Sequence, residues 1–355
     1  MIICQIRGVY RQHITYKQLI MKKLILSLAI VLSSMLGAFA QSSQMATLTH
    51  GTTIASYYGE TALSQAYEAA VHGDVITLTG GNFTAVNIGK AITLRGNGAQ
   101  NNDVNGTLKT TIIGSFTVTI PSGNSNVALL EGFYVYGAID IKGSNENDHA
   151  ILRKLEVSNA IRGKSCSPQI IQSKVNEVNA YEAPCKIFCT NCIISSVSGG
   201  STFSYLGLEL NHCTIVYEAG ASNSTFKNCI FRLCNNNGYY IDNSSNASYC
   251  VGFWSWTGGE SDYEHNIFAN CNASHCTSLG AERNTLFENG WEGSGCDYRL
   301  SETSAATYIG DDGTQMGAYG GNTPYDLTPT NPRIKTFSVS ATNNNNTLNV
   351  RLNVE

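Results

Sequence analysis

Two tryptophans, Trp254 and Trp256, are the residues of this chain best suited to holding a ligand. They stand two positions apart in a segment typical of a β-strand, so alternation sends both indole rings to one face. Acidic residues and a tyrosine follow them directly, namely Glu260, Asp262, Tyr263 and Glu264. Exposed aromatic rings beside carboxylates suit sugar binding, because aromatic faces stack on apolar surfaces. The pattern therefore predicts a glycan-binding patch, with tryptophans packed beneath a long turn as the alternative.

A second candidate site is the acidic pair Asp311 and Asp312, which Gly313 follows. A hard cation such as Ca²⁺ needs several oxygen ligands, and neighbouring carboxylates supply part of such a set. The same triplet is typical of a turn, because an Asp side chain bonds its own backbone and Gly adopts positive φ. We predict the turn and keep both aspartates as candidate ligands of Ca²⁺; no other cofactor is expected.

A zinc or redox centre is not predicted, although Cys189 and Cys192 form a Cys-x-x-Cys pair. Structural zinc needs four ligands, and no second pair with matching spacing is present. The sequence also contains no phosphate-binding loop, no Gly-x-Ser-x-Gly elbow and no His-Glu-x-x-His motif. These classes of chemistry are therefore not expected of this chain.

The elements that must position these residues are short strands, which recur along the middle of the chain. A core position can be aligned at spacings of 20, 17, 21, 16 and 21 residues, through Leu155, Val175, Cys192, Cys213, Cys229 and Cys250. A coil of three short strands and three turns needs about that many residues, and insertions in turns make its length uneven. We therefore predict a solenoid of stacked β-coils, in which each coil packs on its neighbours.

This alignment explains the cysteines, because strict alternation sends the aligned position into the interior. Cysteines on successive coils would stack about 4.8 Å apart along the axis, as small hydrophobic residues that tolerate burial. The alternative is a set of disulfides between neighbouring coils. Of 12 cysteines only Cys4 precedes residue 41, so an odd number remains and at least one thiol must be free. Asparagine ladders are expected at the bends, from Asn191, Asn228 and Asn270.

The start of the solenoid is predicted to be capped by a short amphipathic helix. Leu63, Ala66, Tyr67 and Ala70 recur at helical spacing, and Gly73 can end the helix. Short strands are expected after it, over 75–78, 86–88 and 92–94. A solenoid end exposes apolar core and unpaired backbone, and a helix laid across it covers both.

These elements resemble the first coils of the pectin-lyase-like right-handed parallel β-helix superfamily. The resemblance rests on the helix followed by Gly73-Asp74-Val75-Ile76, Gly81-Asn82-Phe83 and Lys90-Ala91-Ile92-Thr93-Leu94-Arg95-Gly96. Residues 297–300 and 310–320 are similar to the closing coil of secreted bacterial β-helix proteins, except that Ser304-Ala305-Ala306 replaces the usual Ser-Pro-Ala. The resemblance implies an all-β fold, a right-handed parallel β-helix with a capping helix.

The resemblance also implies where catalytic residues would lie. Members that cleave acidic polysaccharides by elimination hold Ca²⁺ with two or three acidic residues on the coil surface, beside an Arg or Lys base, and hydrolytic relatives cluster Asp there. The outward position after each aligned core residue is acidic only once, in the series Glu156, Asn176, Ile193, Thr214, Ile230 and Val251. The remaining catalytic candidates are Asp140, Glu156, Arg153 and Lys142, with ordinary solvated charge as the alternative. Asp140 and Lys142 alternate with Ile139 and Ile141, so both should point outward one coil before Glu156. Three of the six outward residues in the series are aliphatic, so this strand face does not look like a lyase groove, and we expect binding without catalysis.

The two ends of the chain differ in character from its middle. Lys22 and Lys23 precede an apolar run over 24–36, with Ala38 and Ala40 where a signal peptidase reads, so we expect residues 1–40 to be an upstream extension plus a removable signal. The run is too short for a permanent membrane anchor. Residues 41–330 form the predicted β-helix domain. Residues 331–355 alternate as two strands around 343–346, and we expect a hairpin packed on the solenoid's last coil or side.

Charge restricts the partners further. Residues 1–40 hold five of the 22 basic and none of the 26 acidic residues, so the remaining chain has a net charge of −9. Nucleic acid is not an expected partner, and an anionic polysaccharide would meet net repulsion unless one face is locally basic. We expect a monomer exported by a bacterium to the extracellular medium, the cell surface or the periplasm. Its function would be binding glycan or matrix, with a polysaccharide lyase, a glycoside hydrolase or a structural envelope component as alternatives.

Overall fold

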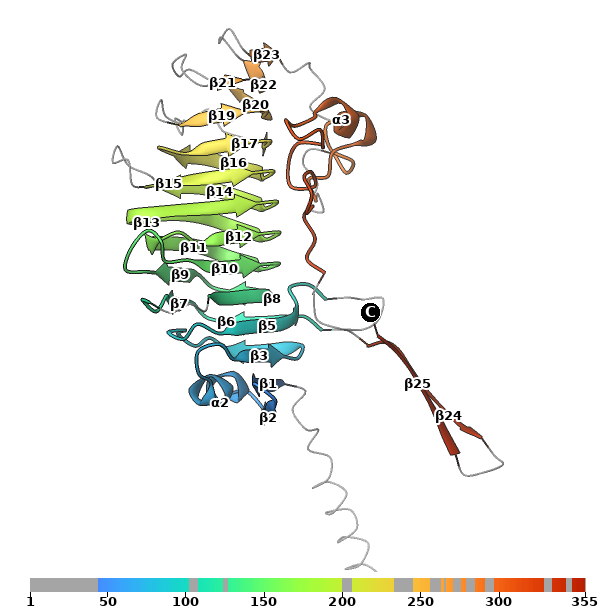
Figure 1. The fold of residues 1–355 in the computed structure, drawn as a ribbon. Coiled ribbons are helices and arrows are strands. Elements are labelled where there is room, and N and C mark those ends of the chain that lie inside the picture. Colours follow the sequence, from blue (N-terminus) through green and yellow to red (C-terminus); the bar gives the residue numbers. More distant parts are fainter. Residues whose placement is uncertain are drawn as a thin grey trace, which may run out of the picture. The chain divides into compact units, whose positions relative to one another are not determined.

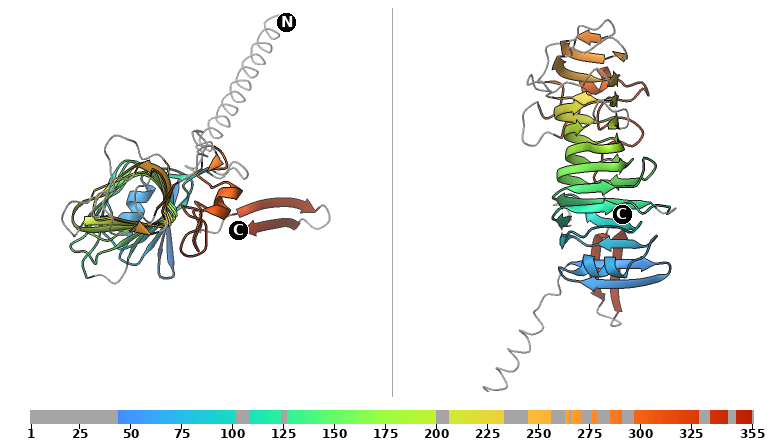
Figure 2. Two further views of the ribbon diagram at one scale, coloured as in Figure 1. Left: turned by 90° about the horizontal axis from the view of Figure 1, so that it is seen from above. Right: turned by 90° about the vertical axis from the view of Figure 1, so that its left-hand side faces the viewer.

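A computed structural model describes twelve stretches of the chain, and residues 1–43 with the predicted signal lie outside them. The described residues are 44–101, 108–123, 127–199, 206–232, 245–255, 263–264, 266–270, 276–278, 285–290, 297–328, 334–342 and 347–354. From β3 to β23 their strands stack as coils of a β-solenoid of about seven turns (Figure 1). Seen along the axis, the coils share one outline around a common core (Figure 2). The predicted fold class is confirmed.

The N-terminal cap combines the predicted helix with a hairpin that the sequence did not indicate. Helix α2 (Ala62–Ala69) lies across the end of the stack and buries Leu63 and Ala66 (Figure 2). Before it, β1 (Met45–His50) pairs antiparallel with β2 (Thr53–Tyr58) and with β3 (Val75–Leu78). The first coil is therefore covered by helix and paired backbone together.

The coils build three parallel sheets. The first contains β3, β5 (Thr93–Gly98), the start of β8 (Ala128–Tyr136), β10 (Ala150–Arg153), β12 (Gln169–Ile171), the end of β13 (Lys174–Thr190), β15 (Leu206–Asn211), β17 (Thr225–Lys227), β19 (Asn246–Ser248) and β21 (Tyr263–Glu264). The second contains β4 (Gly81–Thr84), β6 (Thr110–Ile113), the end of β8, the starts of β11 (Glu156–Cys166), β13, β14 (Ile193–Gly199) and β16 (Thr214–Ala221), β18 (Ile230–Phe231), β20 (Val251–Ser255), β22 (Asn266–Asn270) and β23 (Cys276–Ser278). The third contains β7 (Phe116–Thr119), β9 (Ile139–Lys142) and the later parts of β11, β13, β14 and β16.

A single residue in the left-handed region makes the bend from the first sheet to the second. Six successive coils place such a residue there with φ between 47° and 54°, in the order Lys154, Gln172, Asn191, His212, Asn228 and Tyr249. We call these six the bend column. Asn enters this region at low cost, which explains two of the six. Because His212 separates Asn191 from Asn228, these two asparagines do not stack on one another, and the side chain of Asn270 lies outside the described part.

The bend corrects one position of the sequence alignment. The inward residue after each bend is Leu155, Ser173, Cys192, Cys213, Cys229 or Cys250, so Ser173 occupies the place assigned to Val175. Val175 lies two residues farther on, paired with Val157 and Ile194. The misalignment arose because a buried serine breaks the apolar pattern. Ser173 is tolerated because its hydroxyl donates to Ile171 O (2.8 Å) and accepts from Leu155 N (3.1 Å).

The stacked cysteines are free thiols in the interior. All seven whose side chains the structure describes are free and at most 1% exposed: Cys166, Cys185, Cys189, Cys192, Cys213, Cys229 and Cys250. Each of the four at the aligned position reaches carbonyl oxygens, as Cys213 Sγ does at 3.5 Å from Cys189 O and 3.4 Å from Asn211 O. Burial raises the pKa of the thiols of Cys189, Cys213 and Cys250.

We expect these seven thiols to resist alkylation in the folded protein, because all seven are shielded from the reagent. Burial also disfavours the reactive thiolate of Cys189, Cys213 and Cys250. Iodoacetamide labelling followed by peptide mass spectrometry should modify them at least about 100-fold more slowly than in urea, since exposure requires opening of coils. The protein unfolded in urea, in which every cysteine is accessible, serves as the reference for reagent access. Rapid native labelling of Cys213 would contradict the buried stack.

The C-terminal strands pair as predicted. β24 (Ile334–Thr342) and β25 (Thr347–Val354) form a two-stranded antiparallel sheet, with Thr342 opposite Thr347 at the turn. Their side chains lie outside the described part of the chain. The idea that this hairpin closes the solenoid stays a prediction.

Candidate functional site

The segment 297–328 runs back along the outside of the solenoid, and we call it the strap (Figure 1). It contains the short helix α3 (Glu302–Thr307), whose N-cap Ser301 accepts a hydrogen bond from Ser304 N. The sequence resemblance led us to expect a closing coil over much of this segment. The described strap residues instead include no strand and cross the outer surface of several coils.

The bend column fastens the strap. Asn228 donates to Asp311 Oδ1 (2.8 Å) and accepts from Asp311 N (3.1 Å), while its carbonyl accepts from Gly317 N (2.8 Å). Asn191 Nδ2 donates to Ala318 O (3.0 Å) and Gly320 O (2.7 Å).

The same pattern continues at three other bends. His212 Nε2 lies 2.9 Å from Asp312 Oδ2, Gln172 Nε2 donates to Pro324 O (2.7 Å), and Lys154 Nζ donates to Thr328 O (2.8 Å). The strap therefore descends the stack in order, from the bend at Asn228 to the bend at Lys154.

Apolar packing joins the strap to the outer face of the second sheet. Ile230 and Val251 pack with Leu300 and Met316 of the strap, and with Leu286 and Phe287 from the stretch before it. Ile193 and Val216 pack with Ala318 and with strap tyrosines. The aliphatic outward residues that argued against a lyase groove in the sequence are therefore the docking surface of the strap.

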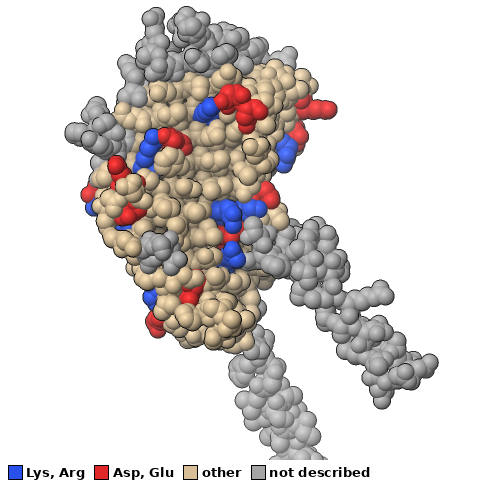
Figure 3. All heavy atoms as spheres, in the orientation of Figure 1, with Lys and Arg blue, Asp and Glu red and all other residues tan. Residues whose placement is uncertain are grey.

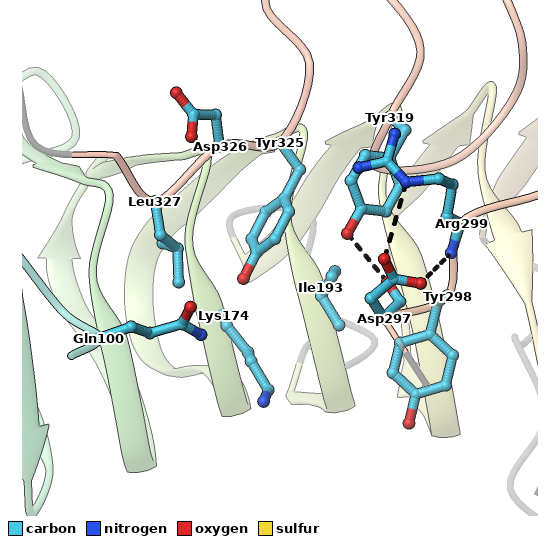
Figure 4. A pocket seen from close by; sticks show the side chains of 10 residues that line it. All are labelled: Gln100, Lys174, Ile193, Asp297, Tyr298, Arg299, Tyr319, Tyr325, Asp326 and Leu327. Carbon is cyan, nitrogen blue, oxygen red and sulfur yellow. Dashed lines mark hydrogen bonds and ion pairs between the residues drawn. The ribbon is translucent and has the colours of Figure 1, made fainter. Parts of the chain in front are cut away.

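A pocket of about 420 Å³ lies where the strap meets the second sheet (Figure 4). Its floor comes from the sheet and its wall from the strap. The lining residues are Gln100, Lys174, Ile193, Asp297, Tyr298, Arg299, Tyr319, Tyr325, Asp326 and Leu327.

Aromatic rings and charged groups alternate around this pocket. The rings of Tyr319 and Tyr325 meet edge to face, with centroids 5.5 Å apart. The Arg299 guanidinium lies 4.1 Å from the centroid of Tyr319, and its Nε lies 3.6 Å from Asp297 Oδ2. Tyr319 in turn donates its hydroxyl to Asp297 O at 3.1 Å, which orients its ring.

Tyr325 offers a donor to the pocket. Its backbone N–H bonds Ala318 O at 2.7 Å, and its hydroxyl points into the cavity in Figure 4, where it makes no hydrogen bond to the described residues. The pKa of this phenol is raised, first by burial and then by electrostatic interactions with the nearby Tyr319 and Glu156. The hydroxyl therefore stays protonated and can donate to a ligand oxygen.

The floor of the pocket is held by a carboxylate just outside it. Glu156 accepts from Gln100 Nε2 at 3.3 Å, and its Oε1 lies 3.4 Å from Lys174 Nζ. These contacts place an amide and an ammonium at the pocket's open side.

The structure does not bring the four catalytic candidates together. Asp140 and Lys142 lie on the third sheet, Glu156 on the second and Arg153 at the end of the first. The sequence interpretation took 139–142 and 156 as equivalent strand faces on successive coils. They belong to different strands of their coils, so their side chains point in different directions.

Three of the four candidates, Asp140, Arg153 and Glu156, each have a charged partner of their own. Asp140 Oδ1 lies 3.4 Å from Arg162, and Arg153 lies 2.8 Å from buried Glu131, which also contacts Arg95 at 3.2 Å. Figure 3 shows acidic and basic residues interspersed on one face, with wide neutral regions between them.

The acidic pair of the strap forms a turn. Asp312 Oδ1 accepts from Thr314 N at 3.0 Å, and Gly313 has φ +79°. Asp311 contacts Lys227, whose hydrogen bond lowers the pKa of this carboxyl. Within the described stretches, no three His, Cys, Asp or Glu side chains are grouped to hold a metal ion.

The side chains of the predicted tryptophan patch lie outside the described part of the chain. Trp254 belongs to β20 and Tyr263 to β21, but their side chains are not described. Trp256, Glu260 and Asp262 lie outside the described residues. The pocket tyrosines were missed because residues 297–320 were interpreted as a coil. Three tyrosines in a segment without strand alternation, at 298, 319 and 325, were the available signal.

Comparisons with protein-family models, curated proteins and solved structures find no match to this chain. No helix among the described residues is long and apolar enough to cross a membrane.

Proposed function

We propose that this is an exported protein that binds a glycan without catalysis, and that the pocket between strap and second sheet is the binding site. The observation that carries the proposal is the set of three tyrosines around the pocket, with the Tyr325 hydroxyl directed inward. Tyrosine rings stack on the apolar faces of sugars while their hydroxyls bond sugar oxygens. The volume of about 420 Å³ lies within the range of small-molecule sites.

The charges of the lining favour a neutral sugar. Lys174 and Arg299 balance Asp297 and Asp326, so the pocket presents both donors and acceptors with little net charge. Hydroxyl groups can use both, whereas an anionic sugar would require an excess of cations.

The lowered pKa of Asp326 supports glycan binding over glycan cleavage. Burial opposes ionisation of this carboxyl, but hydrogen bonds from Thr328 and the ammonium of Lys154 outweigh it and lower its pKa. Asp297 is engaged by Arg299. Glycosidases need one carboxyl that stays protonated as a general acid, and the lowered pKa of Asp326 does not suit that role.

Replacing Tyr325 by Phe tests the site. We expect about 5- to 10-fold weaker glycan binding, since one hydrogen bond contributes about 1–1.5 kcal/mol. A glycan-array screen would identify the ligand, and isothermal titration calorimetry would compare the variants. Tyr181→Phe is the matched control, because Tyr181 lies exposed on β13 and does not line the pocket.

Equal affinity of the wild type and the Tyr325→Phe variant would show that the glycan binds elsewhere on the protein. The Trp254→Ala, Trp256→Ala double variant then asks whether the tryptophan patch binds instead. Assays for unsaturated uronates and for reducing sugars, run on the same glycans, test the lyase and hydrolase alternatives.

A further inference from the structure

Exposure along the second sheet changes abruptly at the pocket. The outward residues Glu156 and Lys174 keep 22% and 48% of their side-chain surface exposed. On the next coils Ile193, Thr214 and Ile230 occupy the same row and are at most 4% exposed. The row is therefore open to solvent up to Lys174 and covered from Ile193 onward.

The strap causes this change. Ala318 N donates to Thr214 Oγ1 at 3.1 Å, so the strap backbone lies directly on the sheet one coil beyond Ile193. Asn191 holds the strap at that level through its bonds to Ala318 O and Gly320 O. Tyr319 and Tyr325 pack with Ile193 and form the wall that faces the open row. A chain lying along the sheet meets this wall and cannot continue past it.

We propose that the pocket recognises the terminal residue of a glycan chain, whose next units lie over the outward row toward Tyr134. This inference rests on the proposed function. Tyr134, Glu156 and Lys174 are in register on neighbouring strands, so about 10 Å separates the first from the last. Lys109 Nζ lies 3.9 Å from the centroid of Tyr134, so the far end of the row offers a ring and an ammonium together.

Stoichiometry separates end recognition from binding along a chain. The probe is a size series of two to eight units, prepared from the strongest hit of the glycan array and titrated calorimetrically. We expect one protein per chain at every length, with affinity constant beyond about four units because the row is then filled. A number of bound proteins that grows with chain length would overturn end recognition.

Modified ends supply a second measurement. Reduction of the reducing end with borohydride, or methylation of the terminal hydroxyls at the other end, should weaken binding at least about 10-fold for one of the two. Equal binding of both modified forms and the parent would overturn the proposal. If the wild type bound no glycan of the array, the proposed function itself would fail, which is a distinct result.

Tyr134→Ala tests the path outside the pocket. We expect affinity for a tetramer to fall about 5- to 10-fold while affinity for the disaccharide stays unchanged. Tyr181→Ala, on the third sheet, is the control for loss of an exposed tyrosine. An equal loss for both sugars, or none for either, would show that the chain does not follow this row.

Discussion

Replacing Asn191 by Ala is expected to release the strap while the coils stay folded. The amide of Asn191 donates to Ala318 O and Gly320 O, and Thr323 Oγ1 lies 3.3 Å from its Oδ1. Its backbone has φ +54°, where Ala is strained. Losing these bonds, leaving Gly320 O without this donor and adding backbone strain together should cost about 3–5 kcal/mol in local stability.

Hydrogen exchange of residues 297–328 measures this opening directly, because a docked segment exchanges with its own local free energy. Glycan binding should fall with it, since Tyr319 and Tyr325 would no longer form the pocket wall. Asn191→Gly separates the loss of hydrogen bonds from backbone strain. Gly adopts the bend conformation at no steric cost, so this variant should destabilise the strap by about 1 kcal/mol less than Asn191→Ala. Wild-type protection of the strap in Asn191→Ala would show that this bend does not hold it.

The solenoid could be predicted because its signals are local. Short strands, uneven coil lengths and an inward cysteine column all come from residues within about one coil of each other, where alternation and turn chemistry act. The capping helix was also predictable, since Leu63 and Ala66 carry its apolar face within two turns. One error arose where a polar residue took an interior place, as Ser173 does. Another lies in the first coil, where the strand expected over 86–88 is instead β4 (Gly81–Thr84).

The strap could not be predicted because its partners are distant in sequence. Asn191 and Ala318 are separated by 127 residues, and nothing near either one indicates the other. The bend residues appear in the sequence as ordinary polar turn residues. Their side chains bind backbone carbonyls that have no sequence signature.

Outward aliphatic residues were one clue to the strap. Ile193, Ile230 and Val251 alternate outward from strands and should have indicated a covering segment, because exposed apolar rows are rare in soluble proteins. We interpreted them instead as the absence of a groove. Their role as the docking surface of the strap also explains the site, because the pocket lies at the edge of the region that the strap covers.

Replacing Gly320 by Ala is expected to prevent the strap from docking along its present path. A Cβ at this position would lie 1.7 Å from Gln315 O and 2.6 Å from His212 Nδ1. The first is backbone that cannot rotate away, and the second belongs to a bend residue that is 3% exposed at its side chain. Overpacking of this severity should cost more than about 3 kcal/mol, at the upper end of the usual range.

Gly313→Ala is the matched control for that steric argument, because Gly313 also lies in the strap but has no atom within 4 Å of its virtual Cβ. Its φ of +79° alone should cost about 1–2 kcal/mol. Urea-dependent hydrogen exchange over 310–328 and limited proteolysis should therefore show an undocked strap in Gly320→Ala and a docked, weakened one in Gly313→Ala. Equal effects would mean that backbone conformation, and not the close approach to Gln315 and His212, makes glycine necessary at position 320.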